Sequence, residues 1–203
     1  SGIDFALFSA GAERSRIFAP AAVASGAVVI DNSSAFRMDP TVPLVVPEVN
    51  AKACAAHQGI IANPNCSTIQ MVLPLKILAE DPGIARVTVA TYQSASGAGQ
   101  SGIDELADGS RAFLDGNEPI ADIFPHPLPF EVLPHIGTFD ASGYTTEELK
   151  MVYETRKILG QPGLEVSATC VRVPVLRAHS EAVTVDLNRG VDLDAGGSVG
   201  RHH

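Results

Sequence analysis

Cysteine is scarce in this chain of 203 residues, with only Cys54, Cys66 and Cys170 present. These three are too few and too unevenly spaced for a disulfide framework or a zinc site, and no Cys-x-x-Cys pair occurs. The sequence also lacks a run of about twenty apolar residues and the basic-then-apolar opening of a signal peptide. We therefore expect a protein that has no metal site, is not bound to a membrane and resides in the reducing cytoplasm.

Basic residues are also in short supply, because 14 Lys and Arg stand against 23 Asp and Glu and the net charge is −9. This balance argues against nucleic acid or an anionic membrane as a partner, since both bind basic surfaces. An anionic ligand would have to be met by a few local arginines or lysines. The composition, 45% hydrophobic and 18% charged, is typical of a globular protein with one large domain or two small ones.

The first third of the chain has the pattern of a parallel α/β sheet. Short apolar runs predict strands, and a helical pattern between the first two makes a strand-helix-strand unit. Ligands bind at the carboxyl ends of the strands in such sheets, which places the turn containing Gly11 at a binding edge. The expected strands lie at residues 5–9, 27–30, 44–46 and 59–62, and the expected helix lies at residues 17–25.

The remaining two thirds alternate between helices and strands around one irregular, proline-rich stretch. Thr145 and Glu148 form a capping-box pattern that opens a helix, and Gly160 closes it. Pro74 lies inside an earlier helical pattern, where it predicts a kink. In order, the expected elements are a helix at 67–80, a strand at 86–93, a helix at 103–114, an extended segment at 117–144, a helix from 145 to 159, and strands at 165–175 and 181–187.

Cys66 is the most informative residue, because it follows an expected strand and opens an expected helix in the run Asn63-Pro64-Asn65-Cys66-Ser67-Thr68. Backbone N–H groups and the positive end of the helix dipole favour a thiolate at that position, so we expect a lowered pKa and a nucleophile. The alternative is a small buried thiol, the commonest state of a free cysteine. The local sequence does not decide between the two.

Residues 97–102 match the pattern G-x-G-x-x-G and follow an expected strand. We reject the match as a dinucleotide fingerprint, because the fingerprint requires a further strand that ends in an acidic residue about twenty positions on. The proline-rich stretch stands there instead. The glycines more simply let the backbone approach a ligand or a neighbouring segment. Gln93, at the end of the strand, is then either a binding side chain or a solvated loop amide.

Arg37 and Lys150 are the candidate anion-binding cations. Arg37 follows the strand at 27–30, at a carboxyl end of the sheet, where its forked donors suit a phosphate or a carboxylate; otherwise it is a surface charge. Lys150 lies in the first turns of its helix, where a cation opposes the helix dipole. A nearby anionic ligand would remove that conflict.

His179 is the candidate acid or base among the six histidines, because a histidine can exchange a proton near neutral pH. It follows Arg172 by seven positions, an odd spacing that would put the two side chains on opposite faces of a straight strand. The two can share a pocket only if the chain bends between them. Pro174 makes such an interruption reasonable.

Six segments taken together resemble the bacterial branch of the aspartate-semialdehyde dehydrogenase family, in the family's order and over nearly the whole chain. They lie at residues 31–37, 63–68, 92–97, 148–150, 154–159 and 172–180. The resemblance implies an α/β fold in two parts. Residues 1–66 would form part of a Rossmann-like parallel sheet, and residues 67–203 an α+β catalytic and dimerisation domain with a mixed sheet, in which residues 196–203 resemble a tail.

The resemblance also implies a role for each candidate residue. Cys66 would carry the acyl thioester, and His179 would act as acid and base. The implied binding residues are Gln93, Arg172 and Glu148 for the substrate, Arg37 and Lys150 for phosphate, and Ser96, Gly97 and Gly11 for the cofactor. Glu148 would face the substrate amino group, although its capping position already gives it a structural task.

The implied reaction is the reversible, NADP-dependent conversion of aspartate semialdehyde and phosphate to aspartyl phosphate by a homodimer, in the biosynthesis of lysine, threonine, methionine and diaminopimelate. A cysteine suits this reaction, because sulfur is a strong nucleophile and its thioester stays reactive toward phosphate. Two alternatives remain open. One is an enzyme like N-acetyl-glutamyl-phosphate reductase, which uses the same acyl-phosphate chemistry, and the other is a non-catalytic dimerisation module.

The chain differs from the family at both ends. It starts after the Gly-rich fingerprint that holds the cofactor pyrophosphate in family members, and it stops before their long closing helix. We therefore expect weak or no NADPH turnover by this chain, although Cys66 should still react with thiol reagents. An NADPH assay run beside thiol labelling tests this expectation, and robust turnover would contradict it.

Overall fold

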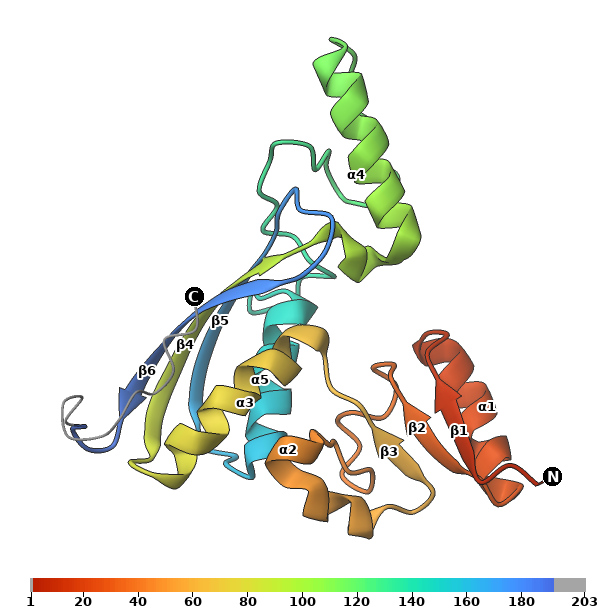
Figure 1. Ribbon diagram of the computed structural model, residues 1–203, viewed down its shortest axis with the longest axis vertical. Helices are drawn as coiled ribbons and strands as arrows, with labels where there is room; N and C mark the ends of the chain where they lie inside the picture. The colour runs from red at the N-terminus through yellow and green to blue at the C-terminus, as the bar shows by residue number, and fades with distance from the viewer. Residues whose placement is uncertain (1, 192–203) are drawn as a thin grey trace.

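The structure, a computed structural model, describes residues 2–191 and contains two separate β-sheets (Figure 1). The first sheet is parallel, with the strand order β1-β2-β3. Its strands are β1 (Phe5–Phe8), β2 (Val28–Asp31) and β3 (Ile60–Ala62), and α1 (Ala12–Ala24) connects the first two. The parallel sheet predicted from the apolar runs is therefore present.

Two elements near this sheet differ from the predicted ones. Residues 44–46 form only an isolated bridge, between Leu44 and Ala62, because Pro43 and Pro47 interrupt any longer ladder on either side. Helix α1 starts at Ala12, well before the predicted start at residue 17. Its first turn lacks an apolar period, yet Ala, Glu and Arg are good helix formers there.

The second sheet is mixed, as predicted, with the order β5-β4-β6. The central strand β4 (Ile84–Gln93) pairs in parallel with β5 (Glu165–Arg172) and antiparallel with β6 (Ser180–Leu187). Strand β5 ends at Arg172 rather than at residue 175, since Pro174 has no N–H to offer a ladder. The chain therefore bends between Arg172 and the start of β6.

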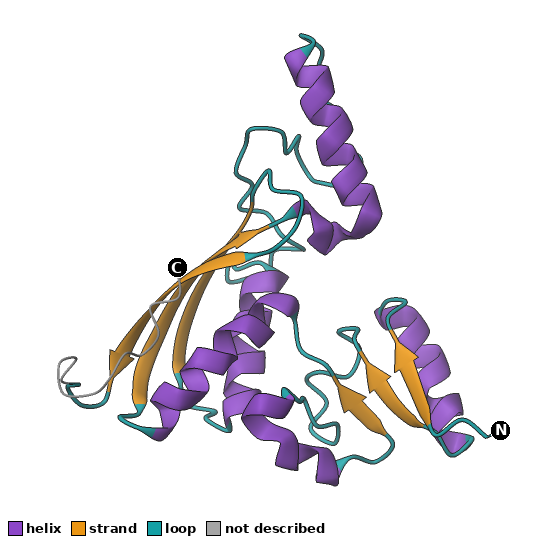
Figure 2. Ribbon diagram, viewed as in Figure 1, coloured by secondary structure: helices purple, strands orange, loops and turns teal. Residues whose placement is uncertain are grey.

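Helices α3 (Cys66–Glu80) and α5 (Thr146–Leu159) pack against the inner face of the second sheet (Figure 2). Helix α5 has the predicted capping box of Thr145 and Glu148, and it ends at Gly160, whose φ of 65° is left-handed. The short helices α2 (Pro47–Asn50) and η1 (Ala51–Ala56) precede β3. The main core cluster joins both long helices to the sheet and includes Met71, Leu75, Val87, Val89, Met151, Ala168 and Cys170.

Helix α4 (Gly99–Leu114) projects away from both sheets and follows the short 3-10 turn η2 (Ala95–Ala98) (Figure 1). It starts at Gly99, before the predicted residue 103, and the sequence pattern missed this first turn because glycine is a weak helix former. Gly102 instead allows close packing. A Cβ on Gly102 would lie 2.8 Å from the backbone oxygen of Ala95. Between α4 and α5 the described chain forms no further helix or strand, in agreement with the predicted extended segment.

The observed architecture confirms the α/β class predicted from the sequence, with a parallel three-stranded sheet followed by a mixed one. Within residues 2–191, no helix combines the length and the apolarity that a membrane crossing requires. The tail predicted at residues 196–203 lies outside the described residues.

Replacing Leu75 by Ala is expected to lower the free energy of unfolding by about 2–5 kcal/mol, because the side chain is 1% exposed and its removal leaves a cavity in the core. The matched control is Ile77→Ala on the same helix, because Ile77 is 65% exposed. Its free energy of unfolding is expected to change by no more than about 0.5 kcal/mol. Urea unfolding of both variants measures the difference. Equal losses in the two variants would contradict the assignment of this core.

Candidate functional site

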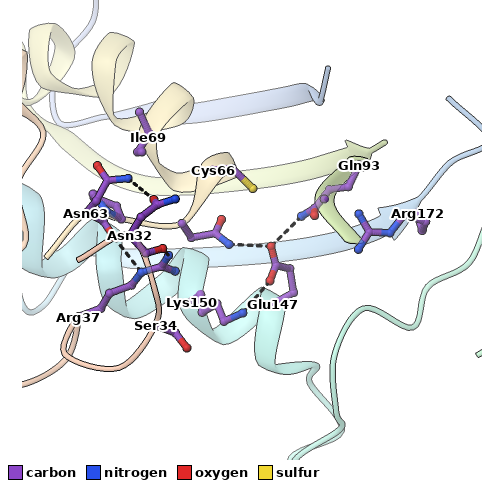
Figure 3. Close-up of a pocket in the computed structure, with 13 residues that line it drawn as sticks. Asn32, Ser34, Arg37, Asn63, Cys66, Ile69, Gln93, Glu147, Lys150 and Arg172 are labelled. Atoms are coloured by element: carbon purple, nitrogen blue, oxygen red, sulfur yellow. Dashed lines mark hydrogen bonds and ion pairs between the residues drawn. The ribbon is translucent and has the colours of Figure 1, made fainter. Parts of the chain in front are cut away.

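A cavity of about 430 Å³ opens where β2, β3, β4 and β5 end, so it is lined by both sheets (Figure 3). This is the carboxyl edge that the sequence predicted for ligand binding. Six of the ten predicted site residues line it: Arg37, Cys66, Gln93, Gly97, Lys150 and Arg172. The structure places His179 beside Gly97, and it places Glu148, Ser96 and Gly11 away from the cavity lining.

Cys66 is the first residue of α3, as the sequence predicted. Asn65 caps the helix, because its side-chain oxygen accepts the N–H groups of Ser67 at 2.9 Å and Thr68 at 3.3 Å. The Cys66 side chain is exposed and projects into the cavity on the side of Gln93 (Figure 3). The reading of Cys66 as a fully buried thiol therefore does not apply.

The pKa of the Cys66 thiol is raised, which is opposite to the direction expected from its place at a helix start. Although the side chain reaches solvent through the cavity mouth, surrounding protein atoms desolvate the sulfur, and this partial burial is the largest cause. The negative charge of Glu147 raises the pKa further. The N–H of Ser67 works in the other direction but does not outweigh these two effects.

Glu147 is a buried carboxylate in the middle of the cavity lining, and sequence reasoning missed it. One oxygen accepts hydrogen bonds from the side chains of Asn65 at 2.8 Å and Gln93 at 3.1 Å, and the other pairs with Lys150 at 3.0 Å (Figure 3). Burial alone would raise the pKa of Glu147, but the charge of Lys150 and these hydrogen bonds bring it below its ordinary value. Glu147 is therefore ionised at neutral pH.

Glu148, the carboxylate that the sequence favoured, is occupied elsewhere. One of its oxygens accepts the N–H of Thr145 at 2.7 Å and the other accepts the N–H of Cys170 at 3.1 Å. Adjacent residues of a helix point about 100° apart, so only one of the pair can face the cavity. Residues three apart lie on the same face of a helix, so Glu147 shares a face with Lys150 and Glu148 does not. This spacing was the signal in the sequence that favoured Glu147 over Glu148 as the carboxylate in the cavity.

Arg37 reaches the cavity from the loop after β2 and is held by a buried ion pair. Its guanidinium lies 3.2 Å from Glu154 of α5, and it also donates to the backbone oxygens of Asn63 at 2.9 Å and Asn32 at 3.2 Å. The second oxygen of Glu154 accepts the N–H of Asn65 at 2.6 Å. Glu154 therefore positions both Arg37 and the residue that precedes Cys66.

Lys157 completes a row of charged residues along one side of α5. Its Nζ donates to the backbone oxygens of Arg37 at 2.8 Å, Asp39 at 2.6 Å and Val42 at 2.8 Å, and so ties the Arg37 loop to the helix. Glu147, Lys150, Glu154 and Lys157 are spaced by three, four and three residues, which is the spacing of one helix face. Two of these side chains line the cavity and two hold the loop that delivers Arg37.

Arg172 and His179 meet at Gly97, because the chain makes the bend between β5 and β6 that a shared pocket needs. A Cβ on Gly97 would lie 2.8 Å from the guanidinium of Arg172 and 3.4 Å from the His179 ring, so glycine permits this close approach. Arg172 donates to the backbone oxygen of Ser94 at 2.8 Å and lies 5.7 Å from the centre of the Phe124 ring.

Gly11 and Ser96 lie away from this cavity. Gly11, with a φ of 92°, precedes α1 without a side-chain cap and lines a separate hollow of about 580 Å³ at the start of that helix. The hydroxyl of Ser96 lies 2.9 Å from that of Ser94. The structure thus brings together the candidate nucleophile, both candidate phosphate residues and two of the three candidate substrate residues, and it leaves Glu148, Gly11 and Ser96 outside the lining of their cavity.

Comparison with known proteins gives the same family for both parts of the chain. Residues 1–57 match the family described as the NAD binding domain of semialdehyde dehydrogenase, and residues 75–196 match its dimerisation domain. Aspartate-semialdehyde dehydrogenase of Aquifex aeolicus is 53% identical over 94% of this chain. The chain belongs to the aspartate-semialdehyde dehydrogenase family. It spans 57% of the length of the Aquifex protein, and 56% of the Bacillus subtilis relative, which is 48% identical.

Solved structures of the aspartate-semialdehyde dehydrogenase family share this fold. Aspartate semialdehyde dehydrogenase II from Vibrio cholerae, solved in complex with ASA, superposes with a TM-score of 0.92 at 49% identity, over 95% of this chain and 58% of that one. The enzyme from Candida albicans, solved with NADP, has a TM-score of 0.68 at 26% identity, over 93% of this chain and 52% of that one. The family resemblance stated from six sequence segments is therefore confirmed.

The family membership implies a nicotinamide cofactor. The described residues offer groups that suit parts of such a cofactor. The uncapped N-terminus of α1 offers backbone N–H groups beside a hollow, and a Cβ on Gly11 would meet nothing within 4 Å. Such a helix end suits a phosphate group. Gly97 leaves room beside Arg172 at the cavity that holds Cys66.

Replacing Glu147 by Gln is expected to lower the pKa of Cys66, because a neutral amide no longer repels the thiolate. The pH profile of Cys66 alkylation by iodoacetamide should move to lower pH, so that the rate at neutral pH rises. The measurement is made with Cys54 changed to Ser, so that only one accessible thiol reacts.

Glu148→Gln is the matched control for this substitution. It alters the neighbouring carboxylate, which lies outside the cavity lining, and glutamine is accepted at that position of a capping box. An unchanged profile in E147Q, or an equal shift in E148Q, would contradict the role given to Glu147.

Proposed function

We propose that this chain is part of an aspartate-semialdehyde dehydrogenase that uses NADP to interconvert aspartate semialdehyde plus phosphate with aspartyl phosphate. The observation that carries the proposal is the placement of Cys66 in one cavity with Arg172 on one side and the pair of Arg37 and Lys150 on the other (Figure 3). The reaction needs a nucleophile between two anion sites, because both the substrate carboxylate and phosphate are anionic. Relatives that share about half of their aligned residues with this chain carry the name of this enzyme, which supports the same activity.

Arg172 is suited to the substrate carboxylate, since a guanidinium presents two parallel N–H donors to such a group. Glu147 takes the role that the sequence gave to Glu148. It is ionised, buried and turned to the cavity, so it can pair with the amino group of the substrate. Gln93 is held by Glu147 at 3.1 Å, which leaves its amide oxygen to accept a hydrogen bond from the same substrate.

Lys150 and Arg37 are suited to phosphate. Arg37 donates three of its five N–H groups to protein oxygens, at Glu154, Asn63 and Asn32, so two remain for a ligand. Lys150 pairs with Glu147 through a single contact at 3.0 Å, which leaves other Nζ protons for an anion. The phosphate would bind in a position already fixed by α5.

The chemistry proposed for Cys66 is nucleophilic. Its thiolate adds to the substrate carbonyl carbon, and His179, whose ring lies beside Gly97 of the cavity lining, handles the proton of the hydroxyl that results. The nicotinamide cofactor, when bound, supplies hydride exchange with the carbon of that adduct. Phosphate exchange at the resulting thioester then needs only the cysteine, the anion-binding residues and a donor to the carbonyl oxygen.

The remaining parts of the proposal concern the cofactor, the assembly and the pathway. NADP is preferred over NAD by analogy with the relative solved with NADP. The match of residues 75–196 to a dimerisation domain supports a homodimer. We assign the protein to the biosynthesis of lysine, threonine, methionine and diaminopimelate, because these pathways consume aspartate semialdehyde. We also assign it to the cytoplasm. The domain boundary at residue 66 and the weak turnover of this chain stay predictions.

Transfer of an acyl group from aspartyl phosphate to Cys66 tests the function without a cofactor. Intact-mass analysis should find one aspartyl group on the chain, and peptide mapping should place it on Cys66. Cys66→Ser should lose the adduct, whereas Cys54→Ser should keep it. Comparison with N-acetyl-glutamyl phosphate separates the two enzyme alternatives, because the proposed substrate should react at least about tenfold faster, and no adduct from either compound would refute the proposal.

A further inference from the structure

Lys157 is held by the loop that follows β2 in a geometry typical of a bound cation. Its Nζ donates to the backbone oxygens of Arg37 at 2.8 Å, Asp39 at 2.6 Å and Val42 at 2.8 Å. An ammonium group carries three protons on one nitrogen, so each proton meets one of these oxygens. Residues 37–42, the Arg37 loop, therefore close around a single positive charge that comes from α5.

The Arg37 loop is anchored at both ends on the first sheet. At one end the side chain of Arg37 donates to the backbone oxygen of Asn63 at 2.9 Å. At the other end the backbone oxygen of Pro43 accepts the N–H of Ala62 in β3 at 2.9 Å. Between these anchors the loop turns three of its backbone oxygens toward Lys157. The negative ends of converging carbonyl dipoles repel one another, so this turn needs a donor at its centre.

The ammonium group is partly shielded from solvent, yet space remains beside its stem. Burial lowers the pKa of Lys157, and the charges of Asp39 and Glu154 oppose that shift. Lys157 lines two hollows of about 490 Å³ each, and one of them is also lined by Met38 and Pro40 of the loop. A small cation from solvent can therefore reach the three oxygens if the lysine side chain is removed.

We propose that the Arg37 loop is a three-carbonyl cation site which Lys157 fills from within the chain, and that Lys157 is thereby a positioning residue for the phosphate-binding guanidinium of Arg37. Arg37 lines the cavity that holds Cys66 (Figure 3). Glu154 holds its guanidinium at 3.2 Å, and Lys157, three residues further along α5, holds its backbone oxygen at 2.8 Å. Both the main chain and the charged head of Arg37 are thus fixed by one helix. The inference rests on the proposed function for the identity of the anion as phosphate.

The direction of the three donors matters in this site as well as the positive charge. A guanidinium is planar and divides its protons among three nitrogens, so it does not point three protons from one atom at three separate oxygens. A primary ammonium has that geometry without distortion. A small primary ammonium ion should therefore be able to take the place of the lysine head group.

Hydrogen exchange of the Arg37 loop, followed by mass spectrometry, tests the cation site without any turnover. Lys157→Ala removes the atoms beyond Cβ, which together have the size of propylammonium. The N–H groups of Asp39 and Val42, which close the turn at 3.1 and 3.2 Å, should exchange at least about tenfold faster in this variant. Propylammonium should slow them again, whereas tetramethylammonium at the same concentration should not, since it has no N–H to donate. Exchange at the wild-type rate in Lys157→Ala, or equal effects of the two cations, would overturn the proposal.

Arg156→Ala is the matched control. Arg156 precedes Lys157 on α5 and also donates to a backbone oxygen, that of Leu164 at 2.8 Å, which lies outside the Arg37 loop. This variant should keep the wild-type exchange of the Arg37 loop and should not respond to propylammonium. Loop exchange as fast as in Lys157→Ala would indicate a general loosening of α5 and would count against the proposal.

The acylation of Cys66 by aspartyl phosphate tests the positioning role. In Lys157→Ala the concentration of aspartyl phosphate that gives half of the maximal rate should rise about tenfold or more, while the maximal rate should change less, because the variant disturbs an anion-binding group. Propylammonium should restore the lower concentration. Alkylation of Cys66 by iodoacetamide, which has no phosphate group, should keep its wild-type rate, measured with Cys54 changed to Ser. An unchanged half-saturating concentration, or an equal slowing of alkylation, would contradict the positioning role.

Lys157→Arg keeps the charge and the apolar stem, so it decides the question if the alanine variant does not fold. Its half-saturating concentration of aspartyl phosphate should also exceed that of wild type, because the planar guanidinium does not match the three oxygens. A wild-type value in this variant would overturn the requirement for three donors on one nitrogen. Absence of acylation in the wild-type chain would instead refute the proposed function, and the exchange measurements would still decide whether the cation site exists.

Discussion

The buried carboxylate of Glu154 is the contact on which the cavity depends. It is 1% exposed, and its two oxygens join the loop after β2, through Arg37, to the start of α3, through the N–H of Asn65. Burial raises the pKa of Glu154 while the charge of Arg37 opposes that rise, so each charge makes the burial of the other tolerable. Removal of either partner would leave an uncompensated charge at the junction of the two sheets.

Helix α5 supplies both the ligand-facing and the supporting charges. Glu147 and Lys150 line the cavity, and Glu154 and Lys157 hold the loop that carries Arg37. Because Glu154 and Lys157 fix the Arg37 loop to the same helix that carries Lys150, the placement of these two cations relative to each other is set by α5. The site is therefore largely formed before a ligand arrives, which reduces the entropy lost on binding.

The sequence predicted the sheets, and it placed six of its ten candidate residues in the cavity lining, because these features depend on local patterns. Apolar runs bounded by proline and glycine gave the strands, and the capping box at Thr145 gave the start of α5. Strand periodicity showed that Arg172 and His179 can share a pocket only across a bend, and Pro174 made such a bend reasonable. The choice between Glu147 and Glu148 failed because a role was assigned by position in a motif, without asking which side of α5 faces the cavity.

Other features depended on contacts that no local pattern encodes. The predicted direction of the Cys66 pKa shift was wrong because it was argued from the helix end alone. Burial of the sulfur in the folded chain and the charge of Glu147, which lies far along the chain on α5, raise the pKa instead. The ion pair of Arg37 with Glu154 spans 117 positions and has no sequence signature of its own. The hydrogen bond that holds the His179 ring comes from the backbone N–H of Ser94, a group that every residue except proline possesses.

The shared face of α5 makes the register of this helix more important than most of its individual side chains. Each residue turns an α-helix by about 100°, so one residue inserted between Lys150 and Glu154 would rotate the supporting half of the helix away from its partners while the ligand-facing half stayed in place. Substitutions on the outer side of α5 leave that geometry intact. Natural variation in this segment should therefore consist of exchanges of residues, while its length stays constant between Thr145 and Lys157.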